Sequence, residues 1–457
     1  MERIVLVNRT ERYGTCSLAE KKAMSKTSAD LAVSPSATPP IADTGVHRPA
    51  RAVFTAVPGR PHALAATGRD AALDYLRAFV TVLVVAHHSV IAYALVSATA
   101  APRSPLRPWL SGIPIVDSHR LSGFDLLALF NDTFFMSRMF FLSGLFVGPS
   151  LARKGGGSFL RDRALRLGAP FVVMALLAPF AYYPAYRATA ADPGVLAFWR
   201  EWLSLGFWPS GPVWFVAVLL GFDVIAAAVH RLDPVLIERV GRLTSICNRR
   251  PTALFVALML VSAAAYLPMR AVFGPESWAT VGPFSVQSSR ALHYLVYFLA
   301  GVAVGDCGIG DGLLAPDGRL GRRWFRWTRN AWALCAVYVV VLVALAPDRP
   351  AFGLPPLARQ LILGLCFVLC CGAISFAMLA VFRRFANTRT PVLTSLSRNA
   401  YGIYLTHYGF VMWLQYALLP AAIPAAAKAA IVLSCTLAAS WATTAALRRI
   451  PAVAKVI

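Results

Sequence analysis

An arginine and two histidines are spaced at helical intervals in the first strongly apolar stretch of the chain. His88 follows Arg77 by 11 residues, which at about 100° per residue returns to within about 20° of the same helix face, about 16 Å further along. His87 lies about 80° off that face. An unperturbed imidazole titrates near pH 6.5, so it can accept a hydroxyl proton at neutral pH. We therefore predict His88 as a general base with Arg77 on its face, and His87 as a packing residue.

The second apolar stretch carries an arginine in its middle. A charge inside a membrane segment is costly without a partner. Arg138 therefore needs an anion, and both Asp132 and a phosphate of a bound ligand are open as candidates. Ser143 and Gly144 follow, a pair of small residues of the kind that often lies at helix contacts in membranes.

A basic segment follows the second stretch and includes Arg163 and Arg166. Residues three apart share a helix face, and planar guanidinium groups suit phosphate oxygens better than an ammonium group does. Phosphate binding is one reading of this pair, and plain topogenic charge is the other. The glycines at 155–157 do not form a P-loop, because no Gly-Lys-Ser/Thr follows them.

Aromatic and polar residues recur near the C-terminal end. Tyr401, Tyr404 and His407 fall on one broad helix face. They could donate to an oxyanion or bind acceptor hydroxyls, and the alternative is hydrogen bonding between helices. Trp208 and Trp214 could stack on a sugar ring or anchor a helix at the membrane interface. None of the eight Cys pairs with His at metal-ligand spacing, so we expect no bound metal.

The elements that position these residues follow from composition. Of 457 residues, 58% are hydrophobic and only 14% are charged, which is typical of a polytopic membrane protein and not of a soluble enzyme. The apolar residues form ten segments, and we predict an all-α protein with about ten transmembrane helices. These segments are centred on 78–97, 126–148, 167–186, 212–230, 253–272, 291–306, 331–346, 360–381, 397–419 and 422–446. The second, sixth and ninth segments carry polar residues and are expected to face the bundle interior.

Charge in the connections predicts the orientation. With the N-terminus inside, the inner loops contain 22 Lys and Arg and the outer loops 10, so the positive-inside rule places both termini in the cytoplasm. Residues 1–68 are predicted to be a disordered cytoplasmic tail without a signal peptide, 69–446 the transmembrane domain, and 447–457 a short basic cytoplasmic tail. The net charge of +23 is then topogenic, and we expect no nucleic-acid partner.

Together these motifs resemble the acyltransferase 3 family of integral membrane O-acyltransferases. The resemblance extends over about residues 69–446, and its finer features look closest to the OpgC-like glucan-modifying branch. Its motifs are LDYLRA with the Arg77 to His88 spacing, FFLSG at 140–144, FLRDRALRLGAPF at 159–171, PVWF at 212–215 and LSRNAYGIYLTH at 396–407.

The resemblance implies acyl transfer from cytoplasmic acyl-CoA to a hydroxyl of a carbohydrate or glycan, in a cell membrane expected to be a bacterial inner membrane. It implies an essential histidine in the first span, here His88 by spacing, and a role for Arg163 and Arg166 in binding acyl-CoA. We add Arg138 and Ser143 as donor-binding candidates. Tyr404, His407 and Trp214 are the candidates for binding the acceptor, and acyl-CoA is a co-substrate, with no permanently bound cofactor.

Two questions stay open at this stage. The histidine could act as a base in one step or carry the acyl group itself in two. A ten-span secondary transporter of a small anionic solute is the alternative function, although the chain shows no pair of related halves with matching broken spans. A membrane scaffold is a third class.

Overall fold

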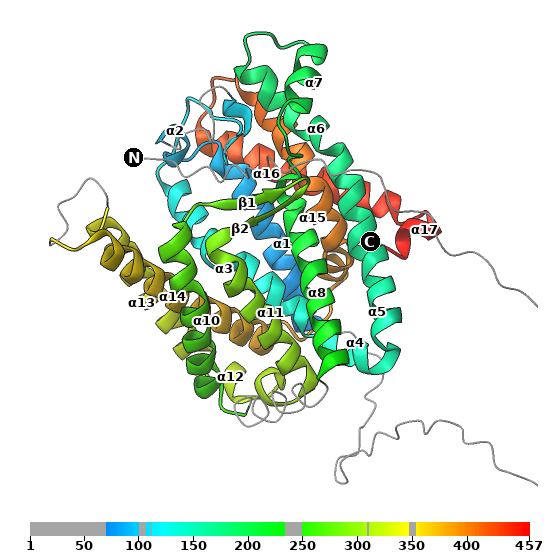
Figure 1. Cartoon of the computed structure of the whole chain (residues 1–457), viewed down its shortest axis with the longest axis vertical. Helices are drawn as coiled ribbons and strands as arrows, with labels where there is room; N and C mark the ends of the chain where they lie inside the picture. The colour runs from blue at the N-terminus through cyan, green and yellow to red at the C-terminus, as the bar shows by residue number, and fades with distance from the viewer. Residues whose placement is uncertain (1–69, 100–106, 111, 234–248, 309, 347–352) are drawn as a thin grey trace, which may run out of the picture. The chain divides into compact units, whose positions relative to one another are not determined.

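The computed structural model describes residues 70–99, 107–110, 112–233, 249–308, 310–346 and 353–457, all within the compact unit Ala66–Ile457 (Figure 1). The predicted tail at 1–68 lies outside the described residues. Within them the chain is helical apart from one two-stranded hairpin, which confirms the predicted all-α membrane fold.

Each of the ten predicted segments lies on a helix. These helices are α1 (Ala71–Ile91), α3 (Gly123–Gly144), α6 (Ala169–Thr189), α8 (Trp214–Leu232), α10 (Pro251–Phe273), α11 (Ala291–Asp306), α13 (Trp324–Ala344), α14 (Pro356–Phe385), α15 (Pro391–Leu418) and α16 (Ala425–Leu447). In the described part of the chain, eight helical segments are long and apolar enough to cross a membrane. The other two are α11, with 16 residues, and α15. The total of ten spans and the cytoplasmic termini stay predictions.

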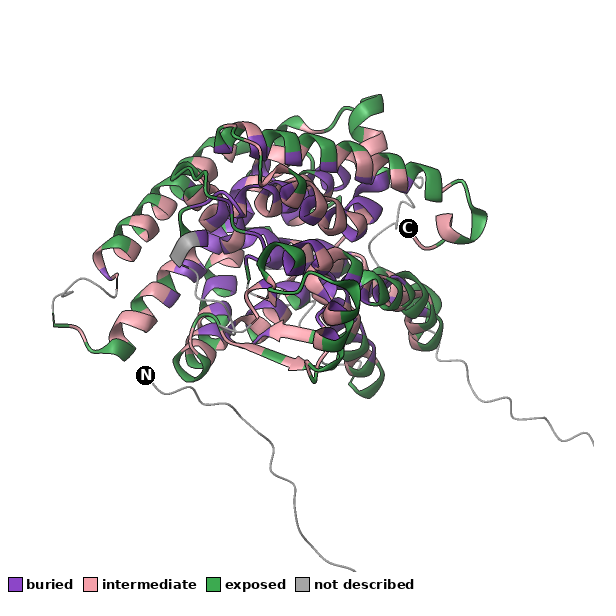
Figure 2. Ribbon diagram, turned by 90° about the horizontal axis from the view of Figure 1, so that it is seen from above, coloured by how far each residue is buried: buried purple, intermediate pink, exposed green. Residues whose placement is uncertain are grey.

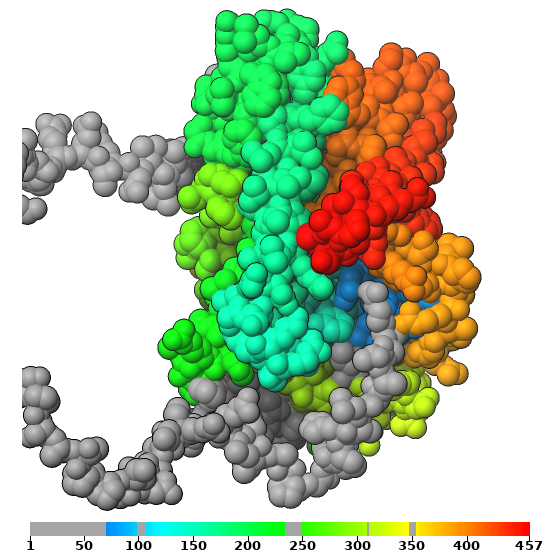
Figure 3. Space-filling view, turned by 90° about the vertical axis from the view of Figure 1, so that its right-hand side faces the viewer, coloured from blue at the N-terminus to red at the C-terminus, as the bar shows by residue number. Residues whose placement is uncertain are grey.

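Shorter elements connect these helices. They are α2 (Val96–Thr99), η1 (Pro108–Leu110), α4 (Val147–Lys154), α5 (Gly156–Arg163), the π-helical η2 (Ala164–Gly168), α7 (Val195–Leu203), η3 (Gly211–Val213), η4 (Ser288–Arg290), η5 (Gly312–Leu314), α12 (Arg319–Arg322) and α17 (Pro451–Ala454). The predicted connection at 267–283 contains β1 (Trp278–Val281), which pairs antiparallel with β2 (Phe284–Gln287). Gly282 supplies the positive φ of 55° at the turn between them. On the face in Figure 3, the C-terminal segment, in red, lies beside α5 and α6.

Burial separates inner helices from peripheral ones. Most of α1, α3 and α14 is buried, whereas Ala331 is the single buried residue of α13. Buried residues gather in the centre of the helical bundle (Figure 2). Exposed apolar side chains on a membrane protein face lipid and not water. Helices α11 and α15 also contribute many buried residues, so the second, sixth and ninth predicted segments face the interior as their polar residues indicated.

Helices α1 and α15 run parallel and in register. Tyr75 Oη lies 3.0 Å from Thr394 Oγ1 near the start of both helices. Near the other end, His88 Nδ1 lies 3.4 Å from His407 Nε2. Both pairs are separated by 319 residues in the sequence, so equal steps along the two helices stay side by side.

The start of α1 is fixed by a carboxylate that serves two elements. Asp70 is the N-cap, and its Oδ1 accepts a hydrogen bond from Leu73 N at 3.0 Å. Its Oδ2 accepts a 2.6 Å hydrogen bond from Nη1 of Arg383, near the end of α14. The beginning of the helix that carries both histidines is thus attached to the buried core.

The connection after α1 folds back and is held by an ion pair. Asp117 N donates to Ala92 O at 3.1 Å, and Lys428 Nζ in α16 lies 2.7 Å from Asp117 Oδ2. The side chains of Lys428 and Asp117 are 0% and 1% exposed. Because a buried charge is costly without its partner, this pair strongly ties the connection to α16.

Candidate active site

The structure brings His88 and His407 together. Their rings lie 5.1 Å apart between centroids, tilted by 57°. His407 is fully buried and His88 is half-buried. The sequence predicts separate roles for these two residues, but they form one group because α1 and α15 are in register.

Backbone carbonyls determine which nitrogen of each ring carries hydrogen. His88 Nδ1 is 2.8 Å from Val84 O, and His407 Nδ1 is 2.6 Å from Tyr404 O. A carbonyl oxygen only accepts, so the Nδ1 atom of each neutral imidazole is the donor. The unprotonated Nε2 of His407 then faces the Nδ1–H of His88. The Nε2 atom of His88 keeps its lone pair and is the basic atom of the site.

The histidines lie at the end of a helix and not at its middle. The predicted segment 78–97 is centred on them, but α1 ends at Ile91, which leaves His88 in the last turn. The final carbonyls of a helix lack intrahelical donors. Gln415 on α15 supplies one, because its Nε2 donates to His88 O at 2.8 Å. Sequence reasoning missed Gln415, whose role follows only from the pairing of α1 with α15.

His87 points toward a different helix. Its ring stacks on Phe135 of α3, with centroids 5.5 Å apart and an interplanar angle of 30°. Its Nδ1 atom is buried, and no described residue forms a hydrogen bond with it. The two adjacent histidines therefore diverge, as the helical phase predicted. Their catalytic roles stay predictions.

An aromatic cluster lies against the histidine pair. Tyr408 meets the His88 ring edge-on at 5.5 Å and lies 5.8 Å from the ring of Tyr182. Tyr182 belongs to a buried cluster that includes Trp109 and Trp202. Sequence reasoning missed Tyr408, although it follows His407 directly.

The other end of the α1–α15 pair carries an arginine-rich pocket of about 640 Å³. Thr394, which contacts Tyr75 of α1, is one of its lining residues. The others are Arg389, Thr390, Pro391, Ser395, Arg398, Asn399, Ala445 and Arg448. Arg77 lies in the same half of α1, with its guanidinium carbon 5.3 Å from the ring centroid of Phe146.

Arg163 and Arg166 have different surroundings. Arg163 Nε lies 3.4 Å from Oδ2 of Asp223 on α8, whose side chain is fully buried. Arg166 is exposed, and its carbonyl accepts a 2.8 Å hydrogen bond from Tyr401 Oη. Residues 164–168 form a π-helix, which changes the angle between successive side chains from that of the α-helix assumed for this pair.

Of the two candidate anions for Arg138, Asp132 pairs with another arginine. Asp132 forms a two-pronged ion pair with Arg290, whose Nη1 and Nη2 lie 2.9 and 2.6 Å from Oδ1 and Oδ2. Arg138 is six residues further along α3 and points to another side of the helix. It is 1% exposed, and its Nε and Nη2 atoms have no hydrogen-bond partner among the described residues. Ser143 is half-buried beside Gly144.

Tyr401 and Tyr404 each donate a hydrogen bond to another element. Tyr404 Oη donates to the carbonyl of Pro212, and Tyr401 donates to Arg166. Both contacts are the hydrogen bonds between elements that the sequence analysis held as the alternative. Trp214 stacks at 6.0 Å on Tyr294 of α11. Trp208 Nε1 donates to Ala175 O at 2.7 Å.

In the part of the chain that the structure describes, no group of three or more His, Cys, Asp or Glu side chains is placed to hold a metal ion.

A family model for an acyltransferase domain matches residues 70–445. No curated protein and no solved structure matches the chain. The matched range begins just before α1 and ends within α16, so it includes both histidines and every lining residue of the arginine-rich pocket except Arg448.

Proposed function

Because this chain belongs to the acyltransferase 3 family of membrane O-acyltransferases, we propose that it moves an acyl group from cytoplasmic acyl-CoA to a hydroxyl of a carbohydrate or glycan, with His88 as general base. The observation that carries the proposal is that the Nδ1 atom of His88 lies within hydrogen-bonding distance of two partners. Its Nδ1–H is held by Val84 O and faces His407 Nε2, so its basic Nε2 is oriented before substrate binds.

The reaction follows from this geometry in two proton transfers. His88 Nε2 removes the proton of the acceptor hydroxyl as its oxygen attacks the thioester carbonyl. The tetrahedral intermediate then collapses, the carbon–sulfur bond breaks, and the imidazolium returns the proton to the leaving thiolate of CoA. The lone pair of His407 Nε2 and the Val84 carbonyl stabilise the positive charge on His88 between these transfers.

The register of α1 and α15 supports a donor that enters from the end with the arginine-rich pocket. From Thr394 to His407 is 13 residues, or about 20 Å at 1.5 Å per residue. The phosphates of CoA are separated from its thioester by the extended pantetheine arm, so phosphates and thioester can occupy the two ends of the helix pair. This assignment places CoA phosphates near Arg398, which lines the pocket about one helical turn before Tyr401, the residue that contacts Arg166.

The aromatic cluster around Tyr408 supports a sugar acceptor at the histidine end. Flat aromatic faces stack on sugar rings, and Tyr408 already contacts the His88 ring. An acceptor there would reach His88 from the side opposite to the donor phosphates. A glucan of the kind modified by the OpgC-like branch is the acceptor that we propose to test first.

The decisive assay measures CoA release by the purified full-length protein in detergent, with acetyl-CoA or succinyl-CoA as donor and a glucan oligosaccharide as acceptor. We expect release that depends on the acceptor and is lost in His88→Ala. A transporter of a small anionic solute would release no CoA above background. If an acylated histidine accumulated in the absence of acceptor, the mechanism would be a two-step relay through acyl-imidazole and not the one-step transfer.

A further inference from the structure

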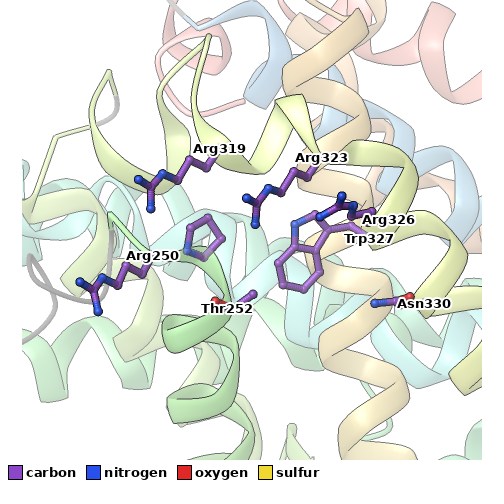
Figure 4. Close-up of a pocket in the computed structure, with 8 residues that line it drawn as sticks. Arg250, Thr252, Arg319, Arg323, Arg326, Trp327 and Asn330 are labelled. Atoms are coloured by element: carbon purple, nitrogen blue, oxygen red, sulfur yellow. The ribbon is translucent and has the colours of Figure 1, made fainter.

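A second arginine-rich pocket, of about 280 Å³, lies away from the histidines, where α10, α12 and α13 meet. Figure 4 shows Arg319 and Arg323 extending from the α12 segment toward the beginning of α10, with Trp327 of α13 beside them. The lining residues are Arg250, Pro251, Thr252, Arg319, Arg323, Arg326, Trp327 and Asn330.

The pocket concentrates positive charge without an internal counter-ion. Four of its eight lining residues are arginines, and none is acidic. In the described ranges, no side-chain hydrogen bond or ion pair engages these four guanidinium groups. By contrast, Arg163, Arg290 and Arg383 each face a carboxylate. Four like charges around one small space repel each other, and a bound anion with several oxygens would relieve that repulsion.

The surroundings of the pocket are those of a lipid-facing surface. Phe255 of α10 and Trp327 of α13 meet edge-on at 5.6 Å directly beside it. From there both helices present exposed apolar side chains, such as Leu260 on α10 at 67% and Val340 on α13 at 66%. A phosphate bound in the pocket would therefore lie next to an apolar surface that acyl chains could cover.

We infer that this pocket binds the phosphate headgroup of an anionic phospholipid, whose acyl chains lie on the exposed faces of α10 and α13. Basic pockets at the ends of membrane helices recognise anionic headgroups in this way, and each Arg near the surface contributes on the order of a 5-fold gain in binding. The site is separate from the α1–α15 pair and does not depend on the acyl-transfer proposal.

The experiment titrates phosphatidylglycerol into full-length protein in a non-ionic detergent and measures bound lipid by native mass spectrometry and the thermal unfolding midpoint. Phosphatidylcholine, inorganic phosphate and CoA are the parallel arms. We expect retention and stabilisation with phosphatidylglycerol but not with phosphatidylcholine or phosphate. The single variants Arg319→Gln and Arg323→Gln should each weaken the response about 5-fold, and the double variant more than 20-fold.

Arg322→Gln is the matched control, because Arg322 is exposed on the same short helix but does not line the pocket. It should respond like the unmodified protein. An equal response of the double variant and the control would overturn the inference. Stabilisation by CoA or phosphate that the double variant alone loses would assign the pocket to a soluble phosphate ligand instead of a lipid. All substituted arginines are exposed, so the variants are expected to fold.

Discussion

The side-chain amide of Gln415 donates a 2.8 Å hydrogen bond to the backbone carbonyl of His88. This contact lies in the last turn of α1, where helical hydrogen bonding ends. It therefore controls the position of the candidate base without touching its ring. Gln415 acts as a positioning residue for His88.

Replacement of Gln415 by Leu should lower kcat about 10-fold and leave KM for acyl-CoA nearly unchanged. The variant loses one buried hydrogen bond, worth about 1 kcal/mol, and leaves the His88 carbonyl without its donor. Steady-state kinetics over a range of acyl-CoA concentrations measures the split between kcat and KM. Gln415→Glu, which cannot donate when ionised, should resemble Leu, and a fully active Leu variant would remove the positioning role.

His88→Ala should abolish transfer, whereas His87→Ala should retain substantial activity. Only His88 faces His407, while His87 stacks on Phe135. His407→Ala should give an intermediate loss, because the base remains but its imidazolium is less stabilised. The rate of CoA release is compared among the three variants, each prepared to equal monodispersity. If His87→Ala were inactive and His88→Ala active, the helical phase would not identify the base.

Arg163→Ala and Arg166→Ala should fail in different ways. Loss of Arg163 leaves Asp223 buried without its cation and should destabilise the protein by about 2 kcal/mol, with partial recovery in Arg163→Ala/Asp223→Asn. Arg166 is exposed, so Arg166→Ala should have the same unfolding midpoint as the unmodified protein. It should raise KM for acyl-CoA about 10-fold and leave kcat mostly unchanged. Thermal unfolding and kinetics separate these outcomes. A collapsed kcat with normal KM in Arg166→Ala would contradict donor binding.

Gly301→Ala should destabilise the protein by about 1–3 kcal/mol. A Cβ at Gly301 would overlap the Phe141 carbonyl and approach Gly144 of α3, so α3 and α11 would have to separate. Gly221→Ala on α8 is the control, because a Cβ there meets nothing within 4 Å. Unfolding midpoints of the two variants in the same detergent measure the difference, and equal midpoints would mean that the close approach is not needed.

The Asp117–Lys428 pair predicts a loss of stability in acid. Burial alone would raise the pKa of Asp117, but hydrogen bonds from Lys428 and His119 outweigh it and hold the pKa below its usual value. An Asp with a lowered pKa in the folded state contributes stability above its unfolded pKa of about 3.9 and loses it as the pH falls through the folded value.

At pH 7, Asp117→Asn should therefore lower the free energy of unfolding by about 3 kcal/mol. Below about pH 4 the difference in unfolding free energy between the variant and the unmodified protein should shrink. Asp317→Asn, at an exposed position, is the control. Unfolding midpoints between pH 3 and pH 7 give the comparison. A difference that stays constant over this range would show that the ion pair is not the cause.

Local patterns predicted much of the fold but less of the site. Runs of apolar residues located the eight helical segments that are long and apolar enough to span a membrane, because length and hydropathy determine a spanning helix. The divergence of His87 from His88 also followed from helical phase alone. The partners of these residues could not be predicted, because they depend on contacts between distant segments: Arg290 is 158 residues from Asp132, and only the α1–α15 pairing identifies Gln415. The π-helix at 164–168 changes the direction of the Arg166 side chain relative to an α-helix, and residue spacing alone does not predict a π-helix.

The in-register pairing of α1 with α15 also bears on biosynthesis. His88 emerges from the ribosome 319 residues before His407, so the first half of the site is complete long before the second exists. During that interval the last turn of α1 lacks the Gln415 donor, and Tyr75 lacks Thr394. A nascent chain released before α15 is inserted would carry His88 without His407 or Gln415 beside it. The candidate site is thus complete only at a late step of translation, once membrane insertion has reached α15.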